Sequence, residues 1–333
     1  MAATVARAAS PSLEGRSGWT AVLGGPNGSH DPVADAPRAI GGGDLVGDAG
    51  HGSLYVAYEG AETETVADDR LRFRVRQGST AALTGWSGMA VVGLDANADG
   101  RLDLLMAWDG SGGSPPVRLL DPGTGLSHSP NTTLTTLLPA GWLASAGVYP
   151  ATSETVQVQS VTASNDPQWN GSADLGNNAG TDSFISWRVP VPDLLAALAK
   201  PSPVDSQGQA GPRGASGIAG VGLTTPVRYV AFTQSGLGAI NGDISGVGAS
   251  FDRNASWADL GAFSAAVPLA EPRGFFSEVR IRQPIDPSGT LNQTEDAAVA
   301  LTGNAPPLSW VKLSIMDTGS GIQTAWTQAD ALG

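Results

Sequence analysis

The sequence contains no cysteine, few basic residues and no long apolar run. The absence of cysteine from all 333 residues excludes disulfide bonds, thiolate metal sites and thiol catalysis. Only 18 lysines and arginines are present and the net charge is −13, which argues against nucleic acid as a partner, because phosphate binding needs clustered basic side chains. No apolar run approaches the length of a membrane span, so we expect none.

Recognisable catalytic motifs are absent too. The chain has no GxSxG elbow, no HExxH helix, no Walker loop and no GxGxxG after a predicted strand. Its three histidines, His30, His51 and His128, occur in Gly-, Ser- or Pro-rich segments without a ligand pair or triad, and we expect surface positions for them. Nothing selects a pair of glycosidase carboxylates among the 31 acids. We therefore predict a protein that is not an enzyme, with no catalytic and no cofactor-binding residues.

Glycine and proline are abundant, with 45 and 23 residues, while the apolar share of 41% is enough for a core. Many turns and short alternating apolar segments predict an all-β protein. The clearest predicted strands are 53–58, 71–76, 154–161, 184–189 and 227–233. One short helix is predicted at 192–199, ended by Pro201. We expect a large, jelly-roll-like β-sandwich domain over residues 1–272.

The stretch that organises this domain runs from Asp95 to Asp103 and has the spacing of a calcium loop. Calcium takes six to eight hard oxygen ligands, and such loops supply side-chain oxygens at positions one, three and five and a backbone carbonyl at seven. The ligands predicted for Ca²⁺ are the side chains of Asp95, Asn97 and Asp99, the carbonyl of Arg101, and Asp103 at position nine. Gly100 stands at position six, where the chain must turn sharply.

The loop departs from a helix-loop-helix site. Position twelve holds Met106 instead of a bidentate Glu, and the flanking runs 89–94 and 104–108 read as buried strands. This strand-loop-strand arrangement resembles the short Asp-rich loops of dockerin-type, thrombospondin-type-3 and FG-GAP repeats, and similar single loops in bacterial surface proteins, which implies a structural ion. Asp109 is the nearest candidate for the missing acidic ligand. The alternative is an acidic turn that binds nothing.

Three further segments have sequence patterns that predict particular contacts or conformations. Arg72, Arg74 and Arg76 share one face of a predicted strand, so we expect acidic partners opposite, with 59–69 as the nearest acidic segment. The polar segment from Asp174 to Asp182 is a weaker candidate for a second cation site. Glycine recurs at every third position from Gly208 to Gly220, but four triplets are too few for a collagen helix and predict a flexible loop.

The composition shifts near residue 271, which predicts a second domain over 273–333. The segment from Val299 to Ile315 resembles bacterial immunoglobulin-like repeats, and this implies a small Ig-like sandwich that lacks its last strands. An incomplete sandwich invites a strand from another subunit. The N-terminal segment from Thr4 is a plausible donor, which would give a head-to-tail homopolymer. A truncated chain is the alternative.

The predicted function is that of a non-enzymatic, calcium-stabilised structural subunit of a bacterial surface fibre or layer. Calcium is scarce in cytoplasm, so we expect an extracellular or cell-surface location, although the first eight residues lack the apolar region of a signal peptide. Trp86, Trp142 and Trp169 fall in predicted loops, where aromatic faces can stack on sugars. The alternative function is therefore a carbohydrate-binding module or adhesin with surface glycans as partners.

Overall fold

The computed structural model divides the chain into two compact units, Met1–Pro272 and Arg273–Gly333. It describes residues 13–16, 18–24, 30–32, 34–36, 43–60, 68–111, 116–175 and 180–270 of the first unit. In the second unit it describes the backbone of four strands. The boundary between the units coincides with the shift in composition near residue 271.

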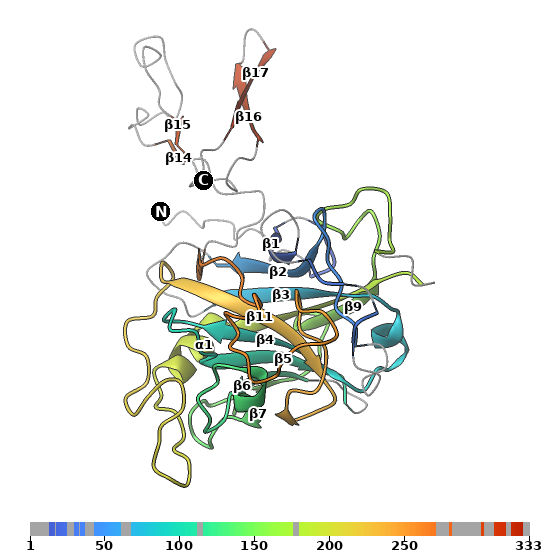
Figure 1. The fold of residues 1–333 in the computed structure, drawn as a ribbon. Helices are drawn as coiled ribbons and strands as arrows, with labels where there is room; N and C mark the ends of the chain where they lie inside the picture. Colours follow the sequence, from blue (N-terminus) through green and yellow to red (C-terminus); the bar gives the residue numbers. More distant parts are fainter. Residues whose placement is uncertain are drawn as a thin grey trace. The chain divides into compact units, whose positions relative to one another are not determined.

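The first unit contains two antiparallel sheets, which confirms the all-β sandwich prediction (Figure 1). One sheet has the order β1-β2-β3-β10-β9, with bounds Thr20–Gly24, Gly52–Glu59, Arg70–Gln77, Ser183–Pro190 and Val156–Ser160. The other has the order β12-β7-β6-β5-β4-β11-β13, with bounds Gly238–Ala239, Leu134–Leu137, Val117–Asp121, Leu104–Asp109, Met89–Asp95, Pro226–Gln234 and Val267–Pro268. Strand β8 (Val148–Tyr149) pairs with β6, and two short 3₁₀ helices span Ala81–Thr84 and Pro130–Thr132.

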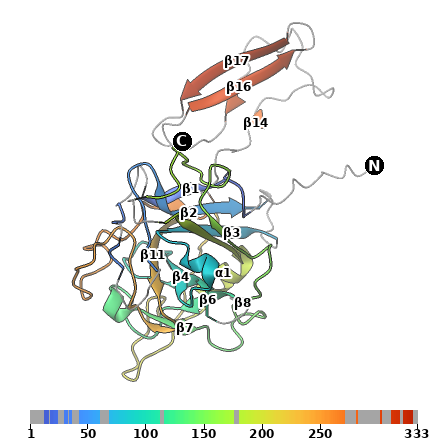
Figure 2. The same cartoon turned by 90° about the vertical axis from the view of Figure 1, so that its right-hand side faces the viewer.

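The main core lies between the two sheets. Alternate residues of β2 and β3, such as Val56 and Phe73, pack in one buried cluster with Val92, Met106 and Tyr229 from the opposite sheet. Alternation in the sequence produces this arrangement, because successive side chains of a strand point to opposite faces. Helix α1 (Val191–Leu198) follows β10 directly and lies beside the sandwich strands (Figures 1 and 2), and four of its apolar residues are buried in this core.

The outer face of each sheet carries a smaller apolar cluster. On the sheet that contains β4 and β11, Val91 and Phe232 pack under Trp257, which stands in the covering segment 240–265. Phe232 and Trp257 stack with ring centroids 6.2 Å apart. On the other sheet, Tyr55 and Phe184 pack with Trp19. Covering segments therefore bury both faces of the central strands of each sheet in the described part of this unit.

The arginine face of β3 is buried beneath such a covering segment. Arg76 forms ion pairs of 2.8 Å with Asp166 and 2.7 Å with Asp182, and all three side chains are inaccessible to solvent. The acidic partners thus come from the β9–β10 connection, so the expectation of partners in the 59–69 segment is wrong for Arg76. Strand order explains the difference, since β10 pairs with β3 and brings its own leading segment against Arg76.

Arg74 has no carboxylate partner among the described residues. Its guanidinium donates to the Ser186 hydroxyl and to the backbone carbonyls of Asn165 and Leu13. It also lies over the Trp19 ring, with its central carbon 4.3 Å from the ring centroid. Desolvation by burial lowers the pKa of Arg74 to about 9.

The glycine-rich segment 208–220 forms a series of turns. Gly214 and Gly217 have φ of +67° and +74°, in the left-handed region and not in the polyproline region that a collagen helix requires. Arg213 anchors the segment, because its guanidinium donates to the Asp121 carboxylate and to the backbone carbonyls of Asp103 and Lys200. The segment is therefore a series of turns anchored through Arg213 and not a collagen helix, and the flexibility of the loop stays a prediction.

The second unit contains two hairpin pairings. Strand β14 (Arg280–Ile281) pairs with β15 (Leu301–Thr302), and β16 (Trp310–Asp317) pairs with β17 (Gly321–Gln328). The predicted strand donor, residues 1–12, lies outside the described residues. Within the described chain, no helix combines the length and the apolar composition needed to cross a membrane.

Candidate functional site

The predicted calcium loop connects the central strands β4 and β5. The two strands pair up to Leu94 and Leu104, and the Asp103 amide donates to the Leu94 carbonyl at 2.7 Å. The structure therefore holds both ends of the loop on a buried hairpin. Asp95 and Asp103 are fully buried at the two strand ends, while Asn97 and Asp99 are exposed.

Local hydrogen bonds shape the loop. The Asn97 side-chain oxygen accepts from the Asp99 amide at 3.1 Å, and an Asp99 carboxylate oxygen accepts from the Arg101 amide at 3.0 Å. Gly100 has a φ of +86°, and a Cβ added there would meet no atom within 4 Å. Backbone conformation, and not steric obstruction, is thus the reason for glycine at this position.

In both Asp95 and Asp103, one carboxylate oxygen accepts hydrogen bonds and the other accepts none. The Oδ2 of Asp103 accepts from the Ala96 amide at 2.8 Å, and the Oδ2 of Asp95 accepts from the Gly100 amide at 3.1 Å and from the Arg228 guanidinium. The Oδ1 atoms of both residues are buried and have no hydrogen-bond partner. A buried carboxylate oxygen without a partner is costly, so these atoms mark a place for a ligand.

The acidic side chains give the loop an excess of negative charge. Burial, together with the neighbouring charges of Asp99 and Asp95, raises the pKa of the Asp103 carboxyl to about 8. Among the described side chains, Arg228 is the one cation in an ion pair with any of the three loop carboxylates, and it pairs with Asp95 alone. One divalent ion would bring the sum of these charges to zero. The donor set consists entirely of hard oxygens, which fits Ca²⁺ in type.

Two observations limit this fit. The carboxylate oxygens of Asp95, Asp99 and Asp103 do not converge within 4.8 Å of one another. The extra ligand expected from Asp109 is also excluded: Asp109 ends β5, about 17 Å along the strand from the loop, and pairs with Arg118 at 2.8 Å. Any further ligands at the loop are therefore backbone carbonyls or water.

The weaker cation site predicted from Asp174 to Asp182 lies partly outside the described residues and stays a prediction. Asp182 is buried against Arg76, and its Oδ2 also accepts from the Leu175 amide at 3.1 Å. The Oδ1 atoms of Asp174 and Asp182 are buried and have no hydrogen-bond partner. Residues 176–179 lie outside the described residues.

The three loop tryptophans pack against protein atoms. Trp86 is buried and stacks on Trp108, with ring centroids 5.9 Å apart. Trp142 is half-buried under Arg213, at 5.1 Å, and the half-buried Trp169 packs against the cluster around Trp19. Their positions thus add no support to the glycan-binding alternative.

The three histidines differ in their surroundings. His51 is fully buried and its Nδ1 lies 2.8 Å from an Asp48 carboxylate oxygen, so the expectation of a surface position is wrong for this residue. His30 is exposed and His128 is half-buried. The nearest hydrogen-bonding side chain to His128 is that of Thr132, at 3.4 Å.

The sequence analysis missed a second acidic cluster, formed by Asp35, Asp44 and Asp243. Asp243 lies about 200 positions after Asp35 and Asp44, and no local spacing connects it with them. The only sequence feature that marked this region was the predicted turn at Asp243, which precedes Ile244, a residue that the structure buries. Comparison of the chain with protein-family models, with curated proteins and with solved structures found no match.

Proposed function

We propose that the chain is a non-enzymatic structural protein whose β-sandwich is stabilised by Ca²⁺ bound at the Asp95–Asp103 loop. The observation that carries this proposal is the pair of buried carboxylate oxygens, Asp95 Oδ1 and Asp103 Oδ1, that have no partner. Together with Asn97, Asp99 and the Arg101 carbonyl they form a hard-oxygen donor set at the spacing of a calcium loop.

The place of the loop in the fold supports a structural role. The loop joins two strands that are buried along their whole length at the centre of one sheet. An ion there would tie the end of β4 to the start of β5 and remove the repulsion among three carboxylates. It would also oppose opening of the hairpin, because the unfolded chain does not hold the ligands together.

The proposal places the protein outside the cell, as part of a bacterial surface fibre or layer. Loops of this kind with millimolar affinity are filled where calcium is millimolar. Head-to-tail assembly by strand donation belongs to the same proposal, and it depends on residues 1–12 and on the second unit. Filaments in negative-stain electron microscopy that disappear when residues 1–12 are deleted would support it, and dispersed monomers of the full chain would refute it.

Calcium-dependent stability tests the proposed ion directly. For an affinity between about 0.1 and 1 mM, 10 mM Ca²⁺ should stabilise the fold by about 1.4 to 2.7 kcal/mol per site relative to the chelated protein. This corresponds to a rise in Tm of roughly 3 to 10 °C. The Asp99→Asn variant should lose most of the loop's share of this rise, because Asp99 is an exposed ligand whose replacement disturbs no buried contact.

The matched control is Glu154→Gln, which removes one exposed acidic charge outside the loop. It should keep the full calcium response. An identical response of wild type and Asp99→Asn would show that calcium does not bind at this loop.

A further inference from the structure

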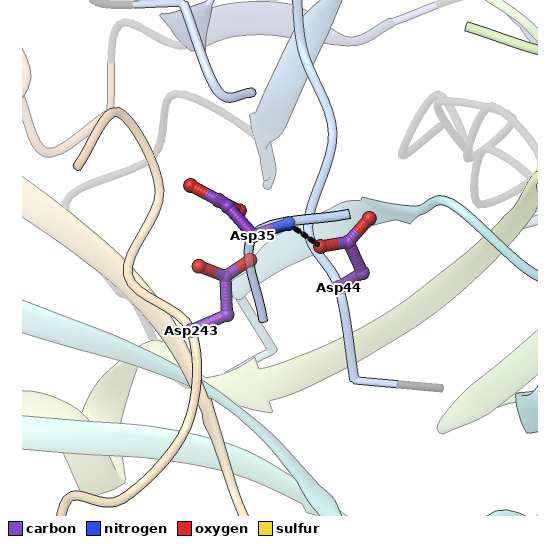
Figure 3. A group of neighbouring side chains, drawn as sticks. All are labelled: Asp35, Asp44 and Asp243. Atoms are coloured by element: carbon purple, nitrogen blue, oxygen red, sulfur yellow. Dashed lines mark hydrogen bonds between the residues drawn. The ribbon is translucent and has the colours of Figure 1, made fainter. Parts of the chain in front are cut away.

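A second group of acids meets at the end of the β1–β2 connection. Asp35, Asp44 and Asp243 each place one carboxylate oxygen within 4.8 Å of the other two, and all three are buried (Figure 3). Asp35 and Asp44 belong to the connection that leads into β2, and Asp243 to the turn that follows β12. Asp31, with 3% of its surface exposed, adds a fourth carboxylate, which lies close enough for the charges of Asp243, Asp35 and Asp44 to act on it.

Two of these acids are held rigidly by backbone amides. Asp44 accepts from the amides of Ala34, Asp35 and Ala36 at 2.8–3.1 Å. Asp243 accepts from the Leu45 amide at 2.7 Å and from the Ile244 amide at 2.8 Å. A carboxylate offers about four acceptor positions, so Asp44 Oδ2 and both Asp243 oxygens keep further capacity, whereas Asp44 Oδ1 already accepts two hydrogen bonds.

Asp35 is the unexplained member of the group. Its side chain is only 9% exposed, and neither of its oxygens accepts a hydrogen bond from a donor group. The Oδ2 of Asp31 is likewise buried without a partner. No ion pair with an arginine, lysine or histidine involves these four acids in the described part of the chain. Buried carboxylates without partners need either a cation or protons.

We propose that Asp35, Asp44 and Asp243 bind a second divalent cation, Ca²⁺ by the nature of its ligands, at a site separate from the Asp95–Asp103 loop. All available ligands are oxygens, and no nitrogen or sulfur ligand belongs to the group. Three side chains leave further coordination positions to backbone carbonyls and water, as is usual for calcium. Asp31 lies close enough to add negative charge to the site.

The position of this site gives it a definite role. Two hydrogen bonds attach the β1–β2 connection to the segment around Asp243: the Leu45 amide donates to Asp243, and the Gly246 amide donates to Asp31. That segment includes Ile244 and Val247, which help to cover the outer face of the β4–β11 sheet. The ion would cross-link two covering segments about 200 residues apart, whereas the loop site acts within one hairpin.

Calcium titration of the full-length, chelator-treated chain tests the proposal. Isothermal titration calorimetry at neutral pH should give two calcium equivalents for wild type, one for Asp35→Asn and one for Asp99→Asn. In chelator, Asp35→Asn should have a higher Tm than wild type, because it removes an unpaired buried charge with little change in shape. In calcium it should show only the rise in Tm due to the loop site. If Asp35 had only a structural role, its replacement would not both raise the Tm in chelator and reduce the rise in Tm caused by calcium.

The outcomes separate the two sites. One equivalent in wild type that is lost in Asp99→Asn would overturn the second site and leave the proposed function standing. One equivalent that is lost in Asp35→Asn would support the second site and refute the loop. Two equivalents in Asp35→Asn, with an unchanged calcium response, would also overturn the second site. If protons alone neutralise these carboxylates, wild type will bind no second calcium ion at any pH between about 6 and 8.

Discussion

Replacement of Arg76 by methionine should destabilise the β-sandwich strongly. Arg76 is the only cation paired with Asp166 and Asp182 among the described side chains, and all three groups are fully buried. Removal of the guanidinium would leave two ionised carboxylates in an apolar environment, between Tyr55 and the Phe184 ring. Methionine keeps most of the apolar volume, so the effect would come from charge and not from a cavity.

The expected magnitude follows from the burial of the group. Loss of one partner of a buried ion pair costs about 3 to 5 kcal/mol, because the remaining charge has lost its compensation. For a domain of this size the Tm should fall on the order of 10 °C. The triple variant Arg76→Met, Asp166→Asn, Asp182→Asn should recover much of this loss, since it leaves no buried charge behind.

Urea denaturation followed by tryptophan fluorescence, in saturating calcium, measures both effects. The comparison must use the free energy of unfolding, with equal m values as evidence that the same transition is observed. A cost below about 1 kcal/mol for Arg76→Met would refute the reasoning, because such a value is typical of an exposed pair. A triple variant no more stable than the single variant would refute it as well.

Two further predictions concern backbone conformation and pH. Gly217→Ala should lower the free energy of unfolding more than Gly214→Ala. Both glycines have a positive φ, but only at Gly217 would an added Cβ clash with backbone, at the Ala199 carbonyl oxygen. Equal changes in the free energy of unfolding for the two variants would contradict this. Burial raises the pKa of Asp69, which accepts a hydrogen bond from the Tyr58 hydroxyl, so the folded state binds this proton more tightly than the unfolded state. This contribution is present below the unfolded pKa and is lost as the pH rises through the folded pKa. Wild type should therefore lose stability relative to Asp69→Asn as the pH rises above about 4, and parallel pH profiles would contradict this.

Local patterns were sufficient to predict most of the elements in the first unit. The alternation at 53–58, 71–76 and 227–233 corresponds to β2, β3 and β11, and the predicted helix at 192–199 corresponds to α1. Each of these follows from the side-chain period of one element. The strand order does not follow from such periods. For this reason the partners of Arg76 were sought in the neighbouring acidic segment instead of in the β9–β10 connection.

The same distinction separates the two candidate ion sites. The Asp95–Asp103 loop was visible in the sequence because nine consecutive residues supply its donors, and the structure adds only their burial and their free oxygens. Asp35, Asp44 and Asp243 come together only after the β1–β2 connection has packed against the segment around Asp243. The loop can keep some affinity for calcium in the unfolded chain, because its ligands stay close along the backbone, and such affinity reduces the stabilisation that binding provides. Asp35, Asp44 and Asp243 are far apart in the unfolded chain, which therefore does not bind a cation with all three. At equal affinity of the folded state, a cation at this site should stabilise the fold more than a cation at the loop.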